Sequence, residues 1–297
     1  MKLTFRTFKG SFGVSEDYIL LHNFLVKSKN TSYTYARLDW MITHKPYLEE
    51  QYLCKIGMWF DGDELVASDL FDTTMDDIFP ITLKGYESLY PEMIEYAQKK
   101  MVRKENPDFR IFIDDSNISL QKVVAKAGFK ATESKDMVAR FDFDDSSTDY
   151  KLPKGFSVVS LQDEKDYKKY LLCLHKGFDH EENGEKFEYN QEIENIVASS
   201  MERKFVDLSL KIAVKAPDGE FVSYCGMWYD KNSDFALIEP VATVPKYRKM
   251  GLGKAAVLEA LHRVFILGAN FAVVGSNQQF YYSIGLRPYT TGTFWTK

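Results

Sequence analysis

The spacing of apolar residues predicts the same order of elements in both halves of the chain. In the first half, residues 55–67 read as strand, turn and strand, with a tight turn at Gly62. In the second half, residues 210–224 repeat this pattern with the turn at Gly219. Asp-Gly turns between apolar runs predict hairpins, because glycine adopts a positive φ without steric cost. We therefore expect one β-hairpin in each half.

A second pair of glycines extends the likeness between the halves. Each half continues with a helical stretch and ends in an amphipathic run, closed by Gly128 in one and by Gly285 in the other. Gly219 follows Gly62 by 157 positions, and Gly285 follows Gly128 by the same interval. Two anchors that share one offset indicate a duplicated fold.

A change of composition marks the boundary between the halves. Residues 142–154 are acidic and rich in serine, and Pro153 favours an extended chain before it. We place a linker there and expect two domains, 1–145 and 146–297. A chain of 297 residues, 45% of them hydrophobic, is long and apolar enough to bury two cores.

Composition excludes several classes of protein. A net charge of −5 argues against a surface that coats nucleic acid or an anionic membrane. The three cysteines are widely spaced and form no C-x-x-C pair, so we expect neither a disulfide framework nor a structural zinc site. The charged start lacks the apolar core of a secretory signal, and nowhere do ~18 apolar residues run together. We therefore expect a soluble, cytoplasmic protein without a metal.

The chemistry is concentrated in one loop of the second half. Residues 235–244 read as a strand that Pro240 opens at an edge or a bulge. A basic loop with Gly251 and Gly253 follows, and apolar positions spaced by three and four then predict a helix that stops at Gly268. Free backbone N–H groups and the positive end of the helix dipole would form an anion cradle there. We expect a ligand with phosphates.

Two common phosphate-binding motifs do not fit this loop. The spacing from Gly251 to Ala256 matches the dinucleotide fingerprint, but six residues separate it from the strand and no acidic residue follows Glu259. A P-loop requires Ser or Thr after its Gly-Lys pair, and Ala255 stands in that position. Neither a Rossmann site nor a P-loop is therefore expected.

A third motif fits in order and in spacing. Arg248-x-x-Gly251-x-Gly253 resembles the acetyl-coenzyme A motif, Q/R-x-x-G-x-G/A, of the GNAT N-acetyltransferase superfamily. Upstream, residues 239–243 are similar to the central strand of that family, and downstream, residues 277–286 resemble its second motif in loose form. The resemblance extends over some 75 residues, from about Lys211 to Pro288.

The resemblance implies a fold, a reaction and a set of ligand-binding residues. The fold is two tandem α/β domains of GNAT type, each a mixed, mostly antiparallel twisted sheet flanked by helices. The reaction is transfer of an acetyl or other short acyl group from acetyl-coenzyme A to an amine, by direct attack in a ternary complex. The implied cofactor-binding residues are Val241, Ala242, Thr243, Val244, Arg248, Lys249, Met250, Gly251, Leu252, Gly253, Lys254 and Asn277.

The offset of 157 predicts that the cradle is lost in the first half. It places Arg248, Gly251, Gly253 and Tyr281 opposite Pro91, Ile94, Tyr96 and Val124. Bulky side chains would keep a pyrophosphate away from the backbone, and valine cannot donate a proton. We therefore expect the first domain to be a degenerate copy that binds no coenzyme A.

Two side chains are implied for proton transfer. The position of Tyr281 in the family motif selects it over Tyr282 as general acid, and a phenol with a pKa near 10 suits protonation of a departing thiolate. Glu239 is implied as general base, directly or through water, because burial on a strand raises the pKa of a carboxyl. Structural roles stay open: Tyr281 as a packing residue, Glu239 as a carboxylate satisfied by a neighbour, and Asn277 as a helix or turn cap.

The acceptor stays open as well. The run from Asp179 to Glu194 holds seven acids and one lysine, which is either a solvated face or a field that attracts a cationic amine. The expected partner is a small-molecule or peptide amine, with no nucleic acid and no membrane. A non-catalytic sensor or scaffold that binds acyl-coenzyme A is the alternative function. The sequence allows an oligomer and leaves the acyl length and the contribution of the first domain undetermined.

Overall fold

The computed structural model describes residues 2–11, 13–42, 48–103, 109–143 and 148–297. The expected linker at 142–154 lies partly outside these residues. The chain divides into two compact units. The first consists of the residues up to Val138 together with 275–277 and 288–297, and the second of 139–274 and 278–287.

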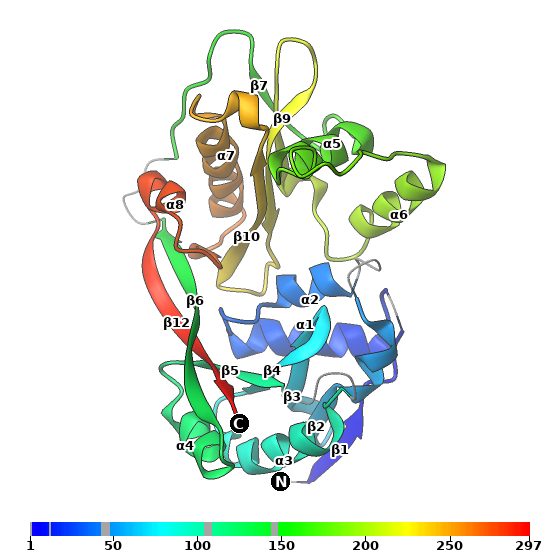
Figure 1. Ribbon diagram of the computed structural model, residues 1–297, viewed down its shortest axis with the longest axis vertical. Helices are drawn as coiled ribbons and strands as arrows, with labels where there is room; N and C mark the ends of the chain where they lie inside the picture. The colour runs from blue at the N-terminus through cyan, green and yellow to red at the C-terminus, as the bar shows by residue number, and fades with distance from the viewer. Residues whose placement is uncertain (1, 12, 43–47, 104–108, 144–147) are drawn as a thin grey trace. The chain divides into compact units, whose positions relative to one another are not determined.

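The first unit is a mixed sheet with helices on its faces (Figure 1). Its strands run in the order β1-β2-β3-β4-β5-β12, followed by the first part of β6, and β4–β5 is a parallel pair among antiparallel pairs. The elements are β1 (Leu3–Thr7), α1 (Glu16–Ser28), α2 (Tyr35–Met41), β2 (Gly57–Asp61), β3 (Glu64–Asp72), β4 (Thr74–Thr82), α3 (Tyr90–Lys100), β5 (Arg110–Asp114), α4 (Ile118–Lys126), β6 (Lys130–Asp142) and β12 (Arg287–Thr296).

The second unit repeats this architecture. From the end of β6 its strands run in the order β6-β11-β10-β9-β8-β7, and β10–β11 is the parallel pair. The elements are β7 (Ser157–Ser160), α5 (Tyr167–Gly177), α6 (Gln191–Met201), β8 (Lys211–Lys215), β9 (Phe221–Trp228), β10 (Phe235–Thr243), α7 (Leu252–Ile266), β11 (Phe271–Val274) and α8 (Gln279–Ile284). The predicted mixed, mostly antiparallel sheets flanked by helices are confirmed.

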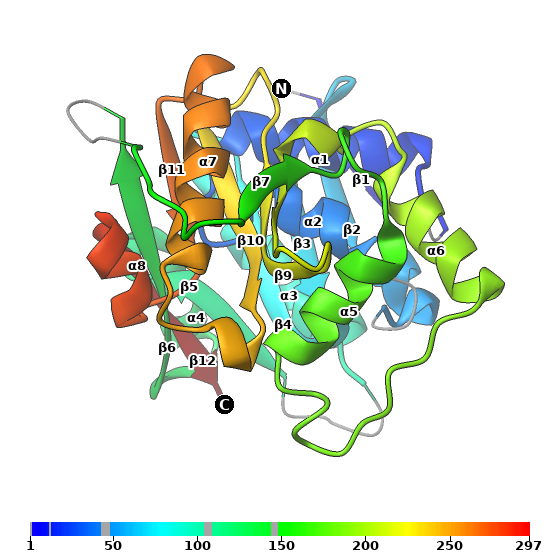
Figure 2. The same ribbon diagram turned by 90° about the horizontal axis from the view of Figure 1, so that it is seen from above.

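Two apolar faces hold the second unit together. Helix α7 presents Val257, Leu261 and Val264, all fully buried, to one face of the sheet. Helix α5 covers the other face, where the ring of Tyr170 meets that of Tyr224 at 4.8 Å between centroids. Figure 2 shows these two helices on opposite sides of β9 and β10. The end of β10 thus lies between α7 and α5.

The four glycines that define the sequence repeat all adopt a positive φ. The values are 61° at Gly62, 87° at Gly219, 93° at Gly128 and 117° at Gly285. Residues other than glycine rarely adopt this backbone conformation. The predicted hairpin turns and the predicted ends of the amphipathic runs are confirmed, as β2–β3, β8–β9, α4 and α8.

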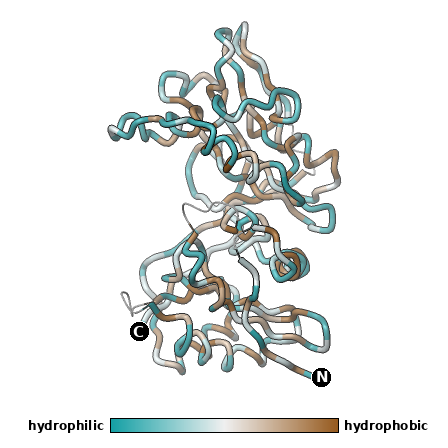
Figure 3. Tube along the Cα trace, turned by 90° about the vertical axis from the view of Figure 1, so that its right-hand side faces the viewer, coloured by the Kyte–Doolittle hydropathy of each residue, from teal (hydrophilic) through white to brown (hydrophobic). Residues whose placement is uncertain are grey.

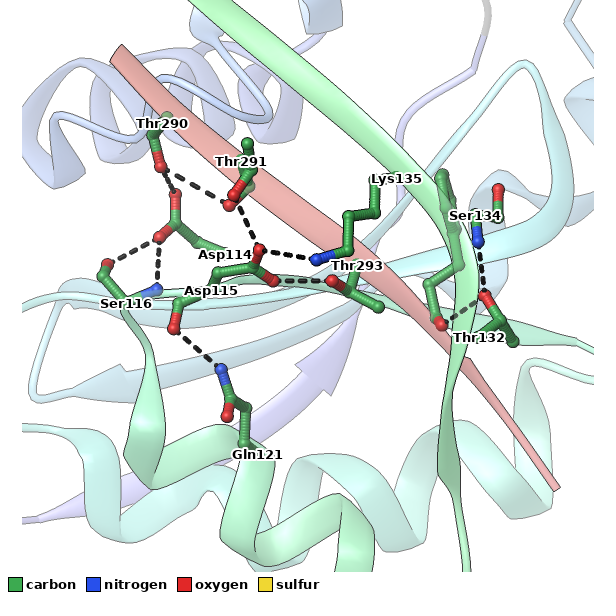
Figure 4. A network of polar contacts seen from close by, with 11 residues as sticks. Asp114, Asp115, Ser116, Gln121, Thr132, Ser134, Lys135, Thr290, Thr291 and Thr293 are labelled. Atoms are coloured by element: carbon green, nitrogen blue, oxygen red, sulfur yellow. Dashed lines mark hydrogen bonds and ion pairs between the residues drawn. The ribbon is translucent and has the colours of Figure 1, made fainter. Parts of the chain in front are cut away.

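The last strand belongs to the first unit, which the sequence did not predict. β12 pairs with β5 from Gly292 opposite Asp114 to Trp295 opposite Ile111. Figure 4 shows the polar contacts that hold it. The carboxylate of Asp115 accepts hydrogen bonds of 2.6 Å from the hydroxyls of Thr291 and Thr293. The expected division at 145/146 therefore assigns these last residues to the wrong unit.

Both units alternate apolar and polar segments along the chain, as the hydropathy colours of Figure 3 show. Over the described residues, no helix combines the length and the apolar character that a membrane crossing requires. Within the same residues, no three or more His, Cys, Asp or Glu side chains gather as metal ligands would.

Candidate active site

The site begins where two parallel strands diverge in the second unit. β10 pairs with β11 only from Phe235 to Leu237, although β10 continues to Thr243. The pairing of β10 with β9 shifts register between Ile238 and Val241, which is a β-bulge. A Cβ on Gly226 would lie 2.3 Å from the carbonyl oxygen of Glu239, so only glycine fits beneath the bulge. Beyond Leu237 the two strands leave a gap between them.

The start of α7 faces this gap. Gly251 is the N-cap residue with a φ of 81°, and no side chain caps the helix there. The first helical hydrogen bond runs from the N–H of Ala255 to the carbonyl of Gly251, at 2.9 Å. The backbone N–H groups of the first turn have no partner further back in the helix, and the helix dipole makes this end positive. A phosphate group is the ligand that such an end favours.

The second glycine of the loop is required by close packing. A Cβ on Gly253 would lie 2.9 Å from Oγ1 of Thr243 and 3.3 Å from the ring of Phe280. The Thr243 hydroxyl is itself within 2.8 Å of the Ser223 hydroxyl. Gly253 therefore lets the first turn of α7 approach the end of β10.

A cavity of about 780 Å³ occupies the space between these elements. Its wall includes nine of the twelve predicted cofactor-binding residues, namely Val241, Ala242, Thr243, Arg248, Lys249, Gly251, Leu252, Gly253 and Lys254. It also includes eight residues from the end of α5, the loop before α7 and α8: Gly177, Phe178, Asp179, Tyr247, Gln278, Phe280, Tyr281 and Ser283. The cavity is large enough for part of a nucleotide-sized ligand.

Three predicted residues lie outside the wall of the cavity. Val244 is buried, and its N–H already donates to the carbonyl of Val222 at 3.0 Å. That N–H is therefore not available to polarise a thioester carbonyl. Met250 is exposed, and Nδ2 of Asn277 lies 3.3 Å from Sδ of Met137.

Tyr281 lies on the wall of the cavity, with 8% of its surface exposed. Burial raises the pKa of its phenol above the ordinary value, and the nearby Cys225 and Glu239 raise it further. The phenol is therefore protonated at neutral pH, as a proton donor must be. Tyr282 is half-buried against the core and does not line the cavity.

Glu239 lies at the bulge rather than on the wall of the cavity. It is half-buried, and its carbonyl oxygen accepts a hydrogen bond of 2.7 Å from the indole N–H of Trp228. Its influence on the pKa of Tyr281 places it in the electrostatic range of that phenol. A proton could reach Glu239 from the cavity only through an intervening group or a water molecule.

Arg248 has three oxygen partners in the protein. Its Nε donates to the carbonyl of Thr243 at 3.1 Å, and its Nη2 donates to the carbonyl of Gly177 at 2.9 Å. The same Nη2 forms an ion pair of 2.6 Å with the carboxylate of Asp179. The sequence predicted Arg248 as a cofactor-binding residue and did not predict that it contacts α5.

The end of α5 is the part of the site that sequence reasoning missed. Gly177 ends the helix, and a Cβ there would lie 2.7 Å from Cβ of Ala242. A glycine at the end of an amphipathic helix was the available signal, but its partner strand lies more than sixty residues further on. His175 and His180 stack on each other at 5.4 Å, and His180 lies 2.9 Å from Glu185.

The equivalent positions in the first unit follow a different offset from the one expected. The N–H of Leu83 donates to the carbonyl of Val66, as that of Val244 donates to Val222. The N–H of Tyr86 donates to the carbonyl of Leu83, as that of Tyr247 donates to Val244. The donors of these bonds and the starts of α4 and α8 are 161 residues apart, whereas Val66 and Val222 are 156 apart. At this offset the expected equivalents Pro91, Ile94 and Tyr96 are wrong. Val124 keeps its match with Tyr281, because the N–H of Phe129 donates to Val124 as that of Leu286 donates to Tyr281. The equivalents of Arg248, Gly251 and Gly253 at the offset of 161 are Glu87, Tyr90 and Glu92.

These side chains close the first unit where the second is open. The hydroxyl of Tyr90 lies 3.2 Å from that of Thr82 and 2.9 Å from Nδ2 of Asn117, so its side chain covers the start of α3. Rings of Tyr33, Phe79 and Phe112 pack between β4 and β5 at 4.9 and 5.4 Å, and leave about 30 Å³. A groove of about 500 Å³ remains outside Tyr90, lined by polar residues that include Glu87 and Asp114.

Comparison with known proteins agrees with this geometry. Residues 175–285 match the model of the acetyltransferase (GNAT) family. No curated protein sequence matches the chain.

Solved structures with this fold include tandem proteins. A tandem GNAT protein from the clavulanic acid biosynthesis pathway is 12% identical, with a TM-score of 0.58 over 100% of this chain and 98% of that one. A GCN5-related N-acetyltransferase from Sphaerobacter thermophilus is 13% identical, with a TM-score of 0.56 over 99% and 95%. An acetyltransferase of the GNAT family from Colwellia psychrerythraea is 9% identical, with a TM-score of 0.56 over the whole of both chains. Residues 175–285 are thus a domain of the GNAT acetyltransferase family, within a chain that has the fold of tandem GNAT proteins.

Proposed function

We propose that the second unit transfers an acetyl or another short acyl group from acetyl-coenzyme A to an amine. The observation that carries this proposal is the cavity of about 780 Å³ at the uncapped start of α7, with Tyr281 on its wall. The positive helix end and the basic residues beside it suit a pyrophosphate. A protonated phenol on the same wall suits a departing thiolate.

The donor is held mainly by the backbone of the loop before α7. The N–H groups of Leu252, Gly253 and Lys254 bind the pyrophosphate, with Gly251 and Gly253 leaving room for its approach. Lys249 and Lys254, which line the same cavity, add positive charge. The pantetheine chain extends along Val241 to Thr243 into the gap between β10 and β11.

The reaction requires two proton transfers. The thioester supplies the acyl group, and the neutral amine attacks its carbonyl carbon, so that an N–C bond forms as the C–S bond breaks. Tyr281 gives its proton to the departing sulfur. Glu239 takes the proton of the amine through a water molecule, since it does not line the cavity itself. No covalent bond to the protein is needed.

The acceptor is most consistent with a cationic amine. Asp179 lines the cavity, and the acidic residues that follow it, including Glu181, Glu182 and Glu185, are exposed. A cluster of exposed carboxylates raises the local concentration of a cation and steers it to the site.

The three cysteines are free, two of them buried, which supports a reducing compartment such as the cytoplasm.

The test is a thiol-release assay with acetyl-coenzyme A over a panel of amines, aminoglycosides, amino acids and lysine peptides. We expect turnover with at least one cationic acceptor, and none with its N-acetylated form. Binding of acetyl-coenzyme A without turnover on any acceptor would instead support the non-catalytic sensor or scaffold. Absence of binding would remove both functions.

A further inference from the structure

The side chain of Arg248 joins three parts of the candidate site. Its three acceptors are the carbonyl at the end of β10, the last carbonyl of α5 and the carboxylate of Asp179, at 3.1, 2.9 and 2.6 Å. Charge-assisted hydrogen bonds of this kind are among the stronger ones in proteins. The guanidinium is thus bonded across the gap between a helix end and a strand end.

The two elements that Arg248 joins also touch directly. Gly177 approaches β10 so closely that a Cβ there would lie 2.7 Å from Cβ of Ala242 and 3.1 Å from the N–H nitrogen of Thr243. Asp179, two residues later, has a φ of 62°, which a residue other than glycine seldom adopts. The ion pair with Arg248 fixes a backbone turn that is unfavourable by itself.

We propose that Arg248 is a positioning residue, which holds the end of α5 against β10 and so forms the acceptor-side wall of the cavity, and that it does not bind the pyrophosphate. The proposal rests on the proposed function. The wall in question consists of Gly177, Phe178 and Asp179. With a carboxylate at 2.6 Å, the guanidinium offers little net charge to a phosphate. The backbone of α7 and the lysines of the loop perform that task.

The first unit has no arginine at the corresponding position. The equivalent of Arg248 is Glu87, whose carboxylate accepts from the N–H of Gly85 at 3.1 and 3.0 Å within its own loop. Helix α1 ends there at Lys29, with a φ of 55° and a hydrogen bond to its own Val26. An arginine between the helix end and the strand end is therefore specific to the unit with the open cavity.

The test compares Arg248→Gln, Asp179→Asn and the double variant. We expect both single changes to act in the same direction, raising KM for the acceptor by up to about fivefold, the worth of a good exposed ion pair. The affinity for acetyl-coenzyme A should change by less than about twofold. The double variant should be no worse than the more affected single variant, because both remove the same contact. Glu220→Gln, with the same loss of charge at an exposed position outside the acidic segment and the cavity, is the matched control.

Opposite effects of the two substitutions on acetyl-coenzyme A binding would overturn the proposal. If Arg248 bound the pyrophosphate directly, Arg248→Gln would weaken acetyl-coenzyme A binding by tenfold or more, and Asp179→Asn would strengthen it by releasing the guanidinium.

Hydrogen exchange in the protein without ligand separates this proposal from the proposed function. The N–H of Phe178 donates to Leu174 at 2.9 Å and that of Asp179 to Lys176 at 3.1 Å. We expect both amides to exchange faster in Arg248→Gln and in Asp179→Asn than in the wild type and in Glu220→Gln. Unchanged exchange would refute the positioning role, whether or not the protein binds acetyl-coenzyme A. Failure of the wild type to bind acetyl-coenzyme A would refute the proposed function and leave the exchange result to decide the contact.

Discussion

The two units share one order of elements and differ where that order could form a site. In the second unit, β10 carries a bulge between Ile238 and Val241 and then separates from β11. In the first, β4 pairs with β3 in regular register from Ile78 to Thr82. The bulged strand borders a cavity of about 780 Å³. Beside the regular strand, aromatic rings leave about 30 Å³, and the groove of about 500 Å³ outside Tyr90 carries the acids Glu87 and Asp114.

The difference shows how little must change to close such a site. In the first unit Tyr90 stands in place of Gly251 and obstructs the start of the helix. Glu87 stands in place of Arg248, so a negative side chain replaces a positive one. The helices and the sheet order are the same in both units, so the fold by itself does not imply the activity. The proposed function depends on the backbone that the glycines expose.

The largest effect is expected from Gly253→Glu. Its carboxylate would meet Thr243 and Phe280 and place a negative charge at the helix start, and like charges in contact weaken binding by several kcal/mol. We expect the affinity for acetyl-coenzyme A, measured by calorimetry, to fall by at least ~100-fold. Ser88→Glu, at an exposed position in the corresponding loop of the first unit, should leave the affinity unchanged. A loss of affinity with Ser88→Glu would place the ligand in the first unit and contradict this account.

Tyr281→Phe should lower kcat on the order of 10²-fold with little change in acetyl-coenzyme A affinity, because it removes only the proton of the proposed general acid. Tyr282→Phe, one residue further along α8 and away from the cavity, is the control and should retain wild-type kcat. If the two variants exchange these outcomes, Tyr282 is the acid. The equivalent in the first unit is a valine, Val124, which has no proton to give.

A smaller, salt-dependent effect is expected from the acidic segment. Replacing Glu181, Glu182 and Glu185 together by glutamine should raise KM for a cationic acceptor several-fold at low salt, since exposed charges each contribute little. The difference from the wild type should vanish as ionic strength approaches 1 M, where the screening length is about 3 Å. Kinetics for acetyl-coenzyme A should stay the same. A preferred acceptor that is neutral or anionic would refute steering.

The smallest effect concerns stability rather than activity. In the sheet of the first unit Asp69 stands opposite Pro80, as Cys225 stands opposite Val241 in the second. Both oxygens of Asp69 are buried without a hydrogen-bond partner among the described residues, and burial raises the pKa of this carboxyl well above its ordinary value.

The sign of the pH dependence follows from this raised pKa. The unfolded state loses the proton above a pH of about 3.9 while the folded state retains it, so folding becomes less favourable as pH rises. Asp69→Asn should therefore raise the free energy of unfolding at pH 7 by at least about 1 kcal/mol, and by almost nothing below pH 4. Denaturant unfolding at both pH values measures it. An equal gain in the free energy of unfolding at both pH values would mean that ionisation of Asp69 is not the cause of the stabilisation.

The sequence predicted the local features and missed those that depend on distant partners. The hairpins at Gly62 and Gly219, the strand at 235–244 and the helix after Gly251 are confirmed, because each follows from local spacing and turn chemistry. The offset of 157 holds at the turn glycines but not between them. Between these glycines, insertions raise the offset at the cradle by four residues, and later deletions restore it. The spacing of the glycines alone does not show these changes, because they cancel.

Two further features could not have been read from spacing. No pattern in the sequence indicates which sheet receives β12, since its partners Asp114 and Asp115 lie far away in sequence. The partner of Arg248 is likewise 69 residues distant, in a segment whose charge alone indicates a solvated face. Long-range pairing is decided by packing, which one sequence does not display.

The most direct test of the difference between the units is the number of acetyl-coenzyme A molecules bound per chain. Isothermal titration of the whole chain should give one site, and Gly253→Glu should abolish it. One site that disappears would locate the ligand at the start of α7 and leave the first unit without a cradle. Two sites per chain, or one site that survives Gly253→Glu, would contradict the distinction between an open and a closed unit.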